Sequence, residues 1–136
     1  MSKKVHTTLL IDDSDIDLFI QRRFLEVYQF SHQLIAFKSA NEALNWLRNL
    51  NGTIAAPEII FLDLNMPEID GFEFLKSFES LPQPILKTTK IVVLTSSNSL
   101  KDREQAFESP NVIQFITKPL KQSDIEELQS RVNGKE

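Results

Sequence analysis

A single acid, Asp63, lies inside an apolar segment, in the stretch IIFLDLNMPEIDG of residues 59–71. A carboxylate is costly to bury and is uncommon within strands. Two more acids, Asp12 and Asp13, directly follow a second apolar segment, residues 5–11. If both segments are strands of a parallel sheet, their carboxyl ends bring the three carboxylates to one edge.

Three converging carboxylates repel one another unless a cation joins them. A hard divalent ion such as Mg²⁺ is the natural partner, since it takes oxygen ligands and commonly bridges to phosphate oxygens. We predict a Mg²⁺ site formed by Asp12, Asp13 and Asp63, with the backbone carbonyl of Asn65 as a further ligand. Asp63 stands alone on its segment, so it can act as a nucleophile that forms an aspartyl phosphate.

Two later segments also end in polar residues. Thr95 ends the segment 90–95, and Lys118 directly follows the segment 111–117. Phosphoryl transfer depends on positioned charge more than on acid–base chemistry. We therefore expect Lys118 and the Thr95 hydroxyl to contact the oxygens of the transferred group.

The elements that must position these residues alternate in type. Apolar segments rich in β-branched residues predict strands, and the segments between them have helical spacing. The strands are 5–11, 32–37, 58–64, 90–95 and 111–117, and the helices are 14–28, 39–50, 72–81, 99–107 and 123–132. This alternation predicts an α/β fold with a five-stranded parallel sheet and helices on both faces.

Three predicted helices carry a clear apolar side. It consists of Phe19, Ile20, Phe24 and Val27 in 14–28, of Ala43, Leu44, Leu47 and Leu50 in 39–50, and of Phe74, Leu75, Phe78 and Leu81 in 72–81. Ser14, Ser39 and Ser123 each precede an acid by three residues and predict helix starts, the last two as capping boxes.

Composition limits the class of protein. The 136 residues fit one domain, and a net charge of -4 argues against nucleic acid as the main partner. The absence of cysteine excludes disulfides and thiolate metal sites. No apolar run approaches the ~18 residues of a membrane span, and the N-terminus does not read as a signal peptide. We expect a cytoplasmic protein without membrane insertion.

The motifs LLIDDSD, IIFLDLNMPEIDG, VVLTSS and FITKPL, in this order, resemble the receiver domain of two-component response regulators. The resemblance covers about residues 5–132, leaving a short polar C-terminal tail within a single domain of residues 1–136, and it is to the stand-alone form of the chemotaxis receivers. It implies a flavodoxin-like, doubly wound sheet with strand order 2-1-3-4-5.

The resemblance also implies a role for each site residue. Asp63 is the expected phosphoacceptor, while Asp13 as direct ligand and Asp12 through water hold Mg²⁺. Thr95 is expected to move toward the phosphoryl group, and Lys118, typically before a cis Pro119, to pair with it. Phe115 is the expected switch aromatic. Asn65 and Ser97 stand where receivers tune hydrolysis of the acyl phosphate.

The implied function is a phosphorylation-controlled switch and not a turnover enzyme. A sensor histidine kinase or a histidine phosphotransfer domain would supply the phosphoryl group. The surface formed by 99–107, 111–117 and 123–132 would then bind a downstream protein or a second copy in a homodimer. With nothing after residue 136, we expect no attached output domain.

One departure and two alternatives accompany this interpretation. Asn111 and Val112 replace a common Gly-Ala pair, and we expect Asn111 to keep the turn in the left-handed conformation. A phosphohydrolase of the haloacid-dehalogenase type would need an acid where Asn65 stands. A pseudo-receiver that binds partners without phosphorylation usually lacks part of the acidic set, which is complete here.

Overall fold

The computed structural model describes residues 5–50 and 55–133, so residues 134–136 of the predicted C-terminal tail lie outside the described residues. The strands are β1 (Val5–Ile11), β2 (Ser31–Phe37), β3 (Ile59–Leu62), β4 (Lys90–Thr95) and β5 (Val112–Thr117). The helices are α1 (Asp15–Val27), α2 (Ala40–Arg48), α3 (Gly71–Phe78), α4 (Gln83–Thr88), α5 (Leu100–Ala106) and α6 (Gln122–Asn133).

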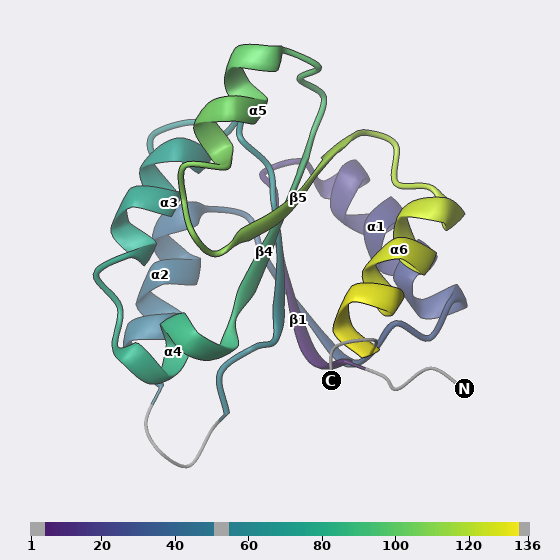
Figure 1. Cartoon of the computed structure of the whole chain (residues 1–136), viewed down its shortest axis with the longest axis horizontal. Helices are drawn as coiled ribbons and strands as arrows, with labels where there is room; N and C mark the ends of the chain where they lie inside the picture. Colours follow the sequence, from purple (N-terminus) through teal and green to yellow (C-terminus); the bar gives the residue numbers. More distant parts are fainter. Residues whose placement is uncertain (1–4, 51–54, 134–136) are drawn as a thin grey trace.

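All neighbouring strands pair in parallel in the order β2-β1-β3-β4-β5, which confirms the predicted fold class. Figure 1 shows the sheet between two layers of helices, with α1 and α6 on one side and α2 to α5 on the other. The central strands β3 and β4 are apolar and buried at nearly every position, because helices cover both of their faces.

The core is divided by the sheet into two clusters. On one side, Leu18 and Leu25 of α1 pack with Ile125 and Leu128 of α6. On the other side, the helices α2 and α3 bury Ala43, Leu44, Leu47, Phe74, Leu75 and Phe78 against the sheet. These six positions confirm the apolar sides predicted for the two helices. Among the described residues, no helix is both long and apolar enough to cross a membrane.

The apolar side predicted for α1 is wrong. Phe19, Ile20 and Val27 are each more than half exposed, and only Phe24 of that set is partly buried. The buried side instead carries Leu18, Gln21 and Leu25, at the spacing i, i+3 and i+7. The helix has apolar residues on two sides, and packing against α6 selects the narrower one.

Helix starts agree with the sequence in two of three cases. The Ser14 and Ser39 side chains accept hydrogen bonds from the backbone N–H of Asp17 and Glu42. Ser123 does not begin a helix, because α6 already starts at Gln122. A reciprocal capping box is formed instead by Asp70 and Glu73, at the start of α3.

Two further features differ from the sequence-based expectations. The short helix α4 was not predicted, because six residues with a proline in the first turn give too little periodicity. Asn111 is not among the described residues with positive φ, which are Gln29 and Glu68. Its buried side-chain amide instead donates to the carbonyls of Leu86 and Thr89, at 2.8 Å each. Asn111 therefore joins α4 to β5 through its side chain.

Candidate functional site

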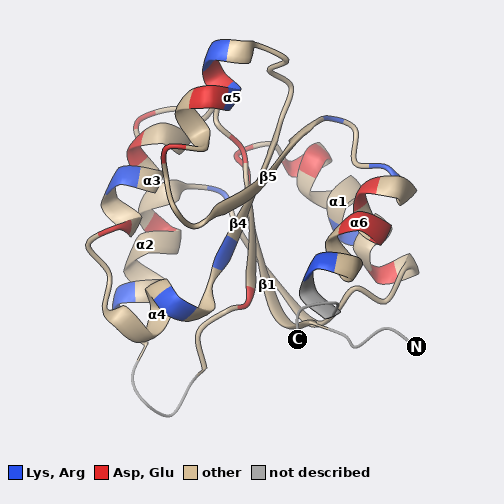
Figure 2. Ribbon diagram, viewed as in Figure 1, with Lys and Arg blue, Asp and Glu red and all other residues tan. Residues whose placement is uncertain are grey.

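The three acids meet at the carboxyl edge of the sheet. Ile11 of β1 pairs with Leu62 of β3, so the next residues, Asp12 and Asp63, emerge side by side. One carboxylate oxygen from each of Asp12, Asp13 and Asp63 lies within 4.8 Å of the other two. Asp12 is 1% exposed and Asp63 is 6% exposed, whereas Asp13 faces solvent. Figure 2 shows acidic segments at the loop after β1 and at the start of α1.

A tight turn after β3 fixes the position of Asp63. The backbone N–H of Asn65 donates to Asp63 Oδ1 at 3.2 Å, and the N–H of Gly71 donates to the carbonyl of Leu64 at 3.0 Å. A Cβ on Gly71 would lie 2.6 Å from Leu64 Cα and 2.7 Å from the Asp63 carbonyl oxygen. Only glycine allows the start of α3 to approach this strand end so closely.

Lys118 enters the same space from the end of β5. Its backbone N–H donates to the carbonyl of Thr95 at 2.7 Å, and its bond to Pro119 is cis. The Lys118 ammonium lies 2.9 Å from Asp12 Oδ2 and 3.5 Å from Asp63 Oδ2. Its nearest partner is Asp17 Oδ2, at 2.7 Å.

Burial and neighbouring polar groups shift the pKa values of Asp63 and Lys118 at the centre of the site. Burial raises the pKa of Asp63, and the neighbouring Asp12 adds to this, while the Asn65 N–H, Lys118 and Thr95 act in the opposite direction. Burial alone would lower the pKa of the Lys118 ammonium. Hydrogen bonds to Asp17 and Asp12, together with the charge of Asp63, outweigh burial and raise it above its ordinary value.

The hydroxyl residues of the strand ends differ in their surroundings. Thr95 is fully buried, and its Oγ1 accepts hydrogen bonds from the Asn65 side chain at 3.4 Å and the Ser97 N–H at 3.3 Å. The Ser97 hydroxyl donates to Asp102 Oδ2 in the first turn of α5, at 2.7 Å. Asn65 thus lies beside both Asp63 and Thr95, whereas the Ser97 hydroxyl is engaged with α5.

Phe115 is a half-buried residue of β5 on the same side of the sheet as Thr95. Phe115 pairs with Val93 and Thr117 pairs with Thr95, so Thr95 and Phe115 are diagonal neighbours. The Arg103 guanidinium of α5 lies 5.9 Å from the Phe115 ring centroid and 5.2 Å from that of Phe107. Phe115 is thus a neighbour of Thr95 in the sheet and of Arg103 in α5.

Two residues of α1 complete the site and were missed by the sequence reasoning. Asp17 pairs with Lys118, and the buried Gln21 donates from Nε2 to Asp12 Oδ2 at 3.2 Å. A signal was available, because Gln21 lies between Leu18 and Leu25 on one helical side and Asp17 precedes it by four residues. The sequence reasoning instead assigned the more apolar side of the helix to the core, and so did not consider Asp17 and Gln21.

The donor set fits a hard divalent cation. It offers only oxygen atoms, from two buried carboxylates and one exposed carboxylate, and a single lysine offsets their charge from one side. Oxygen-only, carboxylate-rich sites favour Mg²⁺ and similar ions over softer metals. Asp12, Asp13 and Asp63 can each offer a carboxylate oxygen to such an ion.

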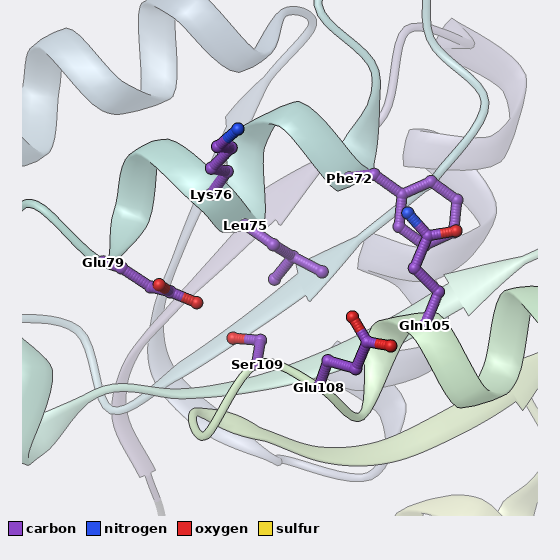
Figure 3. A pocket seen from close by; sticks show the side chains of 7 residues that line it. All are labelled: Phe72, Leu75, Lys76, Glu79, Gln105, Glu108 and Ser109. Carbon is purple, nitrogen blue, oxygen red and sulfur yellow. The ribbon is translucent and has the colours of Figure 1, made fainter.

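A pocket of about 280 Å³ lies elsewhere, between α3 and α5. Figure 3 shows its lining side chains, which include Leu75 of α3, Glu79 directly after α3, and Glu108 and Ser109 shortly after α5. None of its lining residues belongs to the acidic cluster or contacts Lys118. The acidic cluster therefore lies outside this pocket.

Comparison with known proteins agrees with this geometry. The structure superimposes on a two-component response regulator from Cytophaga hutchinsonii with a TM-score of 0.88 and 31% identity, over 96% of this chain and 98% of that one. The Mn²⁺-bound form of response regulator Rcp1 has a TM-score of 0.71 and 28% identity, over 93% and 91% of the two chains.

Sequence relatives give the same result. The probable methanogenesis regulatory protein FilR2 of Methanothrix harundinacea is 30% identical over 118 residues, which are 86% of this chain and 74% of that protein. The chain spans only 54% of the rice two-component response regulator ORR1, to which it is 30% identical. The protein-family model of the response regulator receiver domain matches residues 8–130. The chain therefore belongs to the response regulator receiver domain family.

Proposed function

We propose that this protein is a phosphorylation-controlled switch in which Asp63 accepts a phosphoryl group from a phosphohistidine. The observation that carries the proposal is the convergence of Asp12, Asp13 and Asp63 within 4.8 Å, with the Lys118 ammonium 3.5 Å from Asp63. Family membership supports it, as does the solved form of the relative Rcp1 with bound Mn²⁺.

The proposed transfer step uses the groups that meet at the strand ends. An Asp63 carboxylate oxygen attacks phosphorus, the phosphorus–nitrogen bond of the phosphohistidine breaks, and its electron pair stays on the imidazole nitrogen. Lys118 and the Thr95 hydroxyl donate to oxygens of the new acyl phosphate. Asp12, Asp13 and Asp63, with the Asn65 carbonyl, would hold Mg²⁺, which would supply positive charge to offset the negative charge of the carboxylate and the phosphoryl group.

The phosphodonor would be a sensor histidine kinase or a histidine phosphotransfer domain. The helix α1 begins beside the acids, and its outward side exposes Ile16, Phe19, Ile20 and Val27. Apolar side chains grouped on an exposed helix side are typical of protein contact surfaces. This side is therefore suited to receive the donor protein next to Asp63.

Phosphorylation would act on the opposite side of the site through Thr95 and Phe115. When the Thr95 hydroxyl turns toward the acyl phosphate, it frees space that the Phe115 ring can occupy. The predicted output surface, which is α5, β5 and α6 in Figure 1, also exposes Leu100 of α5 and Phe107 directly after it. A downstream protein or a second copy that prefers the repacked surface shifts the equilibrium toward it. Asn65 and Ser97 would set how slowly the protein dephosphorylates itself.

Labelling with acetyl phosphate tests the proposal. Intact-mass measurement with MgCl₂ should show one phosphoryl group on the native protein and on Asp15→Asn, and none on Asp63→Asn. Asp15 is a matched control because it is an exposed acid of α1 that pairs with Lys38. Equal labelling of Asp63→Asn would refute the assignment, and rapid turnover of small phosphomonoesters would favour a hydrolase instead.

A second experiment tests the switch. Backbone amide NMR spectra with Mg²⁺ and beryllofluoride should shift signals of α5 and β5 in the native protein. In Thr95→Val, which keeps the shape but lacks the hydroxyl, the shifts around Phe115 should largely disappear. If they persist unchanged, Thr95 does not couple the site to this surface.

A further inference from the structure

Lys118 is bound more closely to α1 than to the residue on which it is expected to act. Its ammonium lies 2.7 Å from Asp17 Oδ2 and 2.9 Å from Asp12 Oδ2, but 3.5 Å from Asp63 Oδ2. The first two distances are those of charge-assisted hydrogen bonds, and the third is too long for one. An ammonium has three N–H donors, so two of them are committed away from Asp63.

The place of Asp17 is fixed by the start of α1. The Ser14 side chain accepts from the Asp17 N–H at 3.1 Å, and the next residue, Leu18, is buried in the core. Gln21, one turn later, donates to the same Asp12 oxygen that Lys118 contacts. The first two turns of α1 thus hold both Lys118 and its second partner.

Unlike the other acids of the site, Asp17 does not belong to the group of carboxylates that could hold a cation. The group that can hold a cation contains Asp12, Asp13 and Asp63, and Asp17 is not part of it. Its side chain is 36% exposed, against 18% for Lys118, so its charge remains solvated while it holds the ammonium. Among the described residues, Lys118 is its ion-pair partner.

We propose that Asp17 is a positioning residue that holds Lys118 back from Asp63 in the unphosphorylated protein and competes with the acyl phosphate for it. This inference rests on the proposed function. A phosphoryl group on Asp63 brings negative oxygens toward the ammonium, which then leaves Asp17 to bind them. Asp17 consequently weakens the bound state relative to a site in which the lysine is free.

The test measures binding of beryllofluoride with saturating Mg²⁺ by calorimetry, in the native protein, Asp17→Asn and Asp15→Asn. A partly exposed ion pair contributes up to about 1 kcal/mol, so Asp17→Asn should bind beryllofluoride more tightly than the native protein, by up to about fivefold. Asp15→Asn makes the same charge change in the same helical turn but leaves Lys118 untouched, and it should bind like the native protein. Asp17→Glu retains the carboxylate and should also stay close to native affinity.

A double-mutant cycle separates competition for the lysine from a general effect of charge. In a Lys118→Met background, Asp17→Asn should no longer tighten binding. The inference is overturned if Asp17→Asn binds no more tightly than Asp15→Asn, or if the gain persists without Lys118. Failure of the proposed function looks different, because the native protein itself would then not bind beryllofluoride with Mg²⁺. Circular dichroism establishes that each variant is folded, and Asp17→Ser replaces Asp17→Asn if the latter is not.

Discussion

Replacing Asp63 by asparagine should make the metal-free protein more stable, although it removes the residue proposed to carry the phosphoryl group. Asp63 is 6% exposed, and Asp12 and Asp13 present oxygens within 4.8 Å of it. Asparagine has nearly the same shape, and its oxygen can still accept from the Asn65 N–H. The substitution therefore removes a buried charge while it keeps the packing.

The magnitude follows from the distances. With an effective dielectric constant of about 20, repulsion by the Asp12 carboxylate at 4.8 Å destabilises charged Asp63 by about 3.5 kcal/mol. Attraction to the Lys118 ammonium at 3.5 Å stabilises it by about 4.7 kcal/mol. The exposed Asp13 adds a smaller repulsion because water screens it. These terms nearly cancel, so the burial of the carboxylate, which is the largest cause of its raised pKa, decides the sign. We expect Asp63→Asn to be about 1–2 kcal/mol more stable at pH 7.

Urea unfolding at pH 7 in EDTA and in MgCl₂ measures the effect. In EDTA, Asp63→Asn should unfold at the higher urea concentration, and Asp15→Asn should match the native protein. Mg²⁺ at 100 times its Kd should stabilise the native protein by about 2.7 kcal/mol. The native protein should then be at least as stable as Asp63→Asn.

The pH dependence has a definite sign. Because the pKa of Asp63 is raised above its ordinary value of 3.8, the folded state binds more protons than the unfolded state between these two values. The free energy of unfolding of the native protein therefore falls as pH rises through this window, and the destabilisation reaches its full value above the window. The advantage of Asp63→Asn should disappear below pH 3.8. If Asp63→Asn is the less stable protein in EDTA at pH 7, burial of the Asp63 carboxylate does not destabilise the fold as described.

Three other substitutions test the surroundings of the site, each by urea unfolding. Lys118→Met leaves the carboxylate of Asp12, which is 1% exposed, without its cation. The free energy of unfolding should fall by about 3 kcal/mol in EDTA and by less in MgCl₂. Equal losses in both buffers would contradict this expectation. Gly71→Ala places a Cβ 2.6 Å from Leu64 Cα and should cost about 1–3 kcal/mol, and native-like stability would show that the turn relaxes freely. Asn111→Ala leaves two backbone carbonyls without their donor and should lower the free energy of unfolding by about 1–3 kcal/mol. Asn111→Gly should be destabilised as well, and native-like stability of this variant would show that backbone conformation, and not the side-chain amide, is important.

Apart from the short helix α4, the sequence by itself determined the type and order of the elements. Strands covered on both faces are apolar at consecutive positions, so 5–11 and 90–95 were predicted with the bounds they have in the structure. The parallel arrangement then placed Asp12, Asp63, Thr95 and Lys118 at one edge, because polar residues that follow parallel strands must meet there. These inferences depend only on local pattern and on a rule of topology.

Tertiary structure alone decided which contacts these residues make. The helix α1 has apolar residues on two sides, and only its packing against α6 and the sheet buries Leu18, Gln21 and Leu25. That rotation about the helix axis brings Asp17 to Lys118, a residue 101 positions away in the chain. The periodicity of a helix states how its residues are spaced, but not which side faces the core, because that choice is made by the surfaces it packs against.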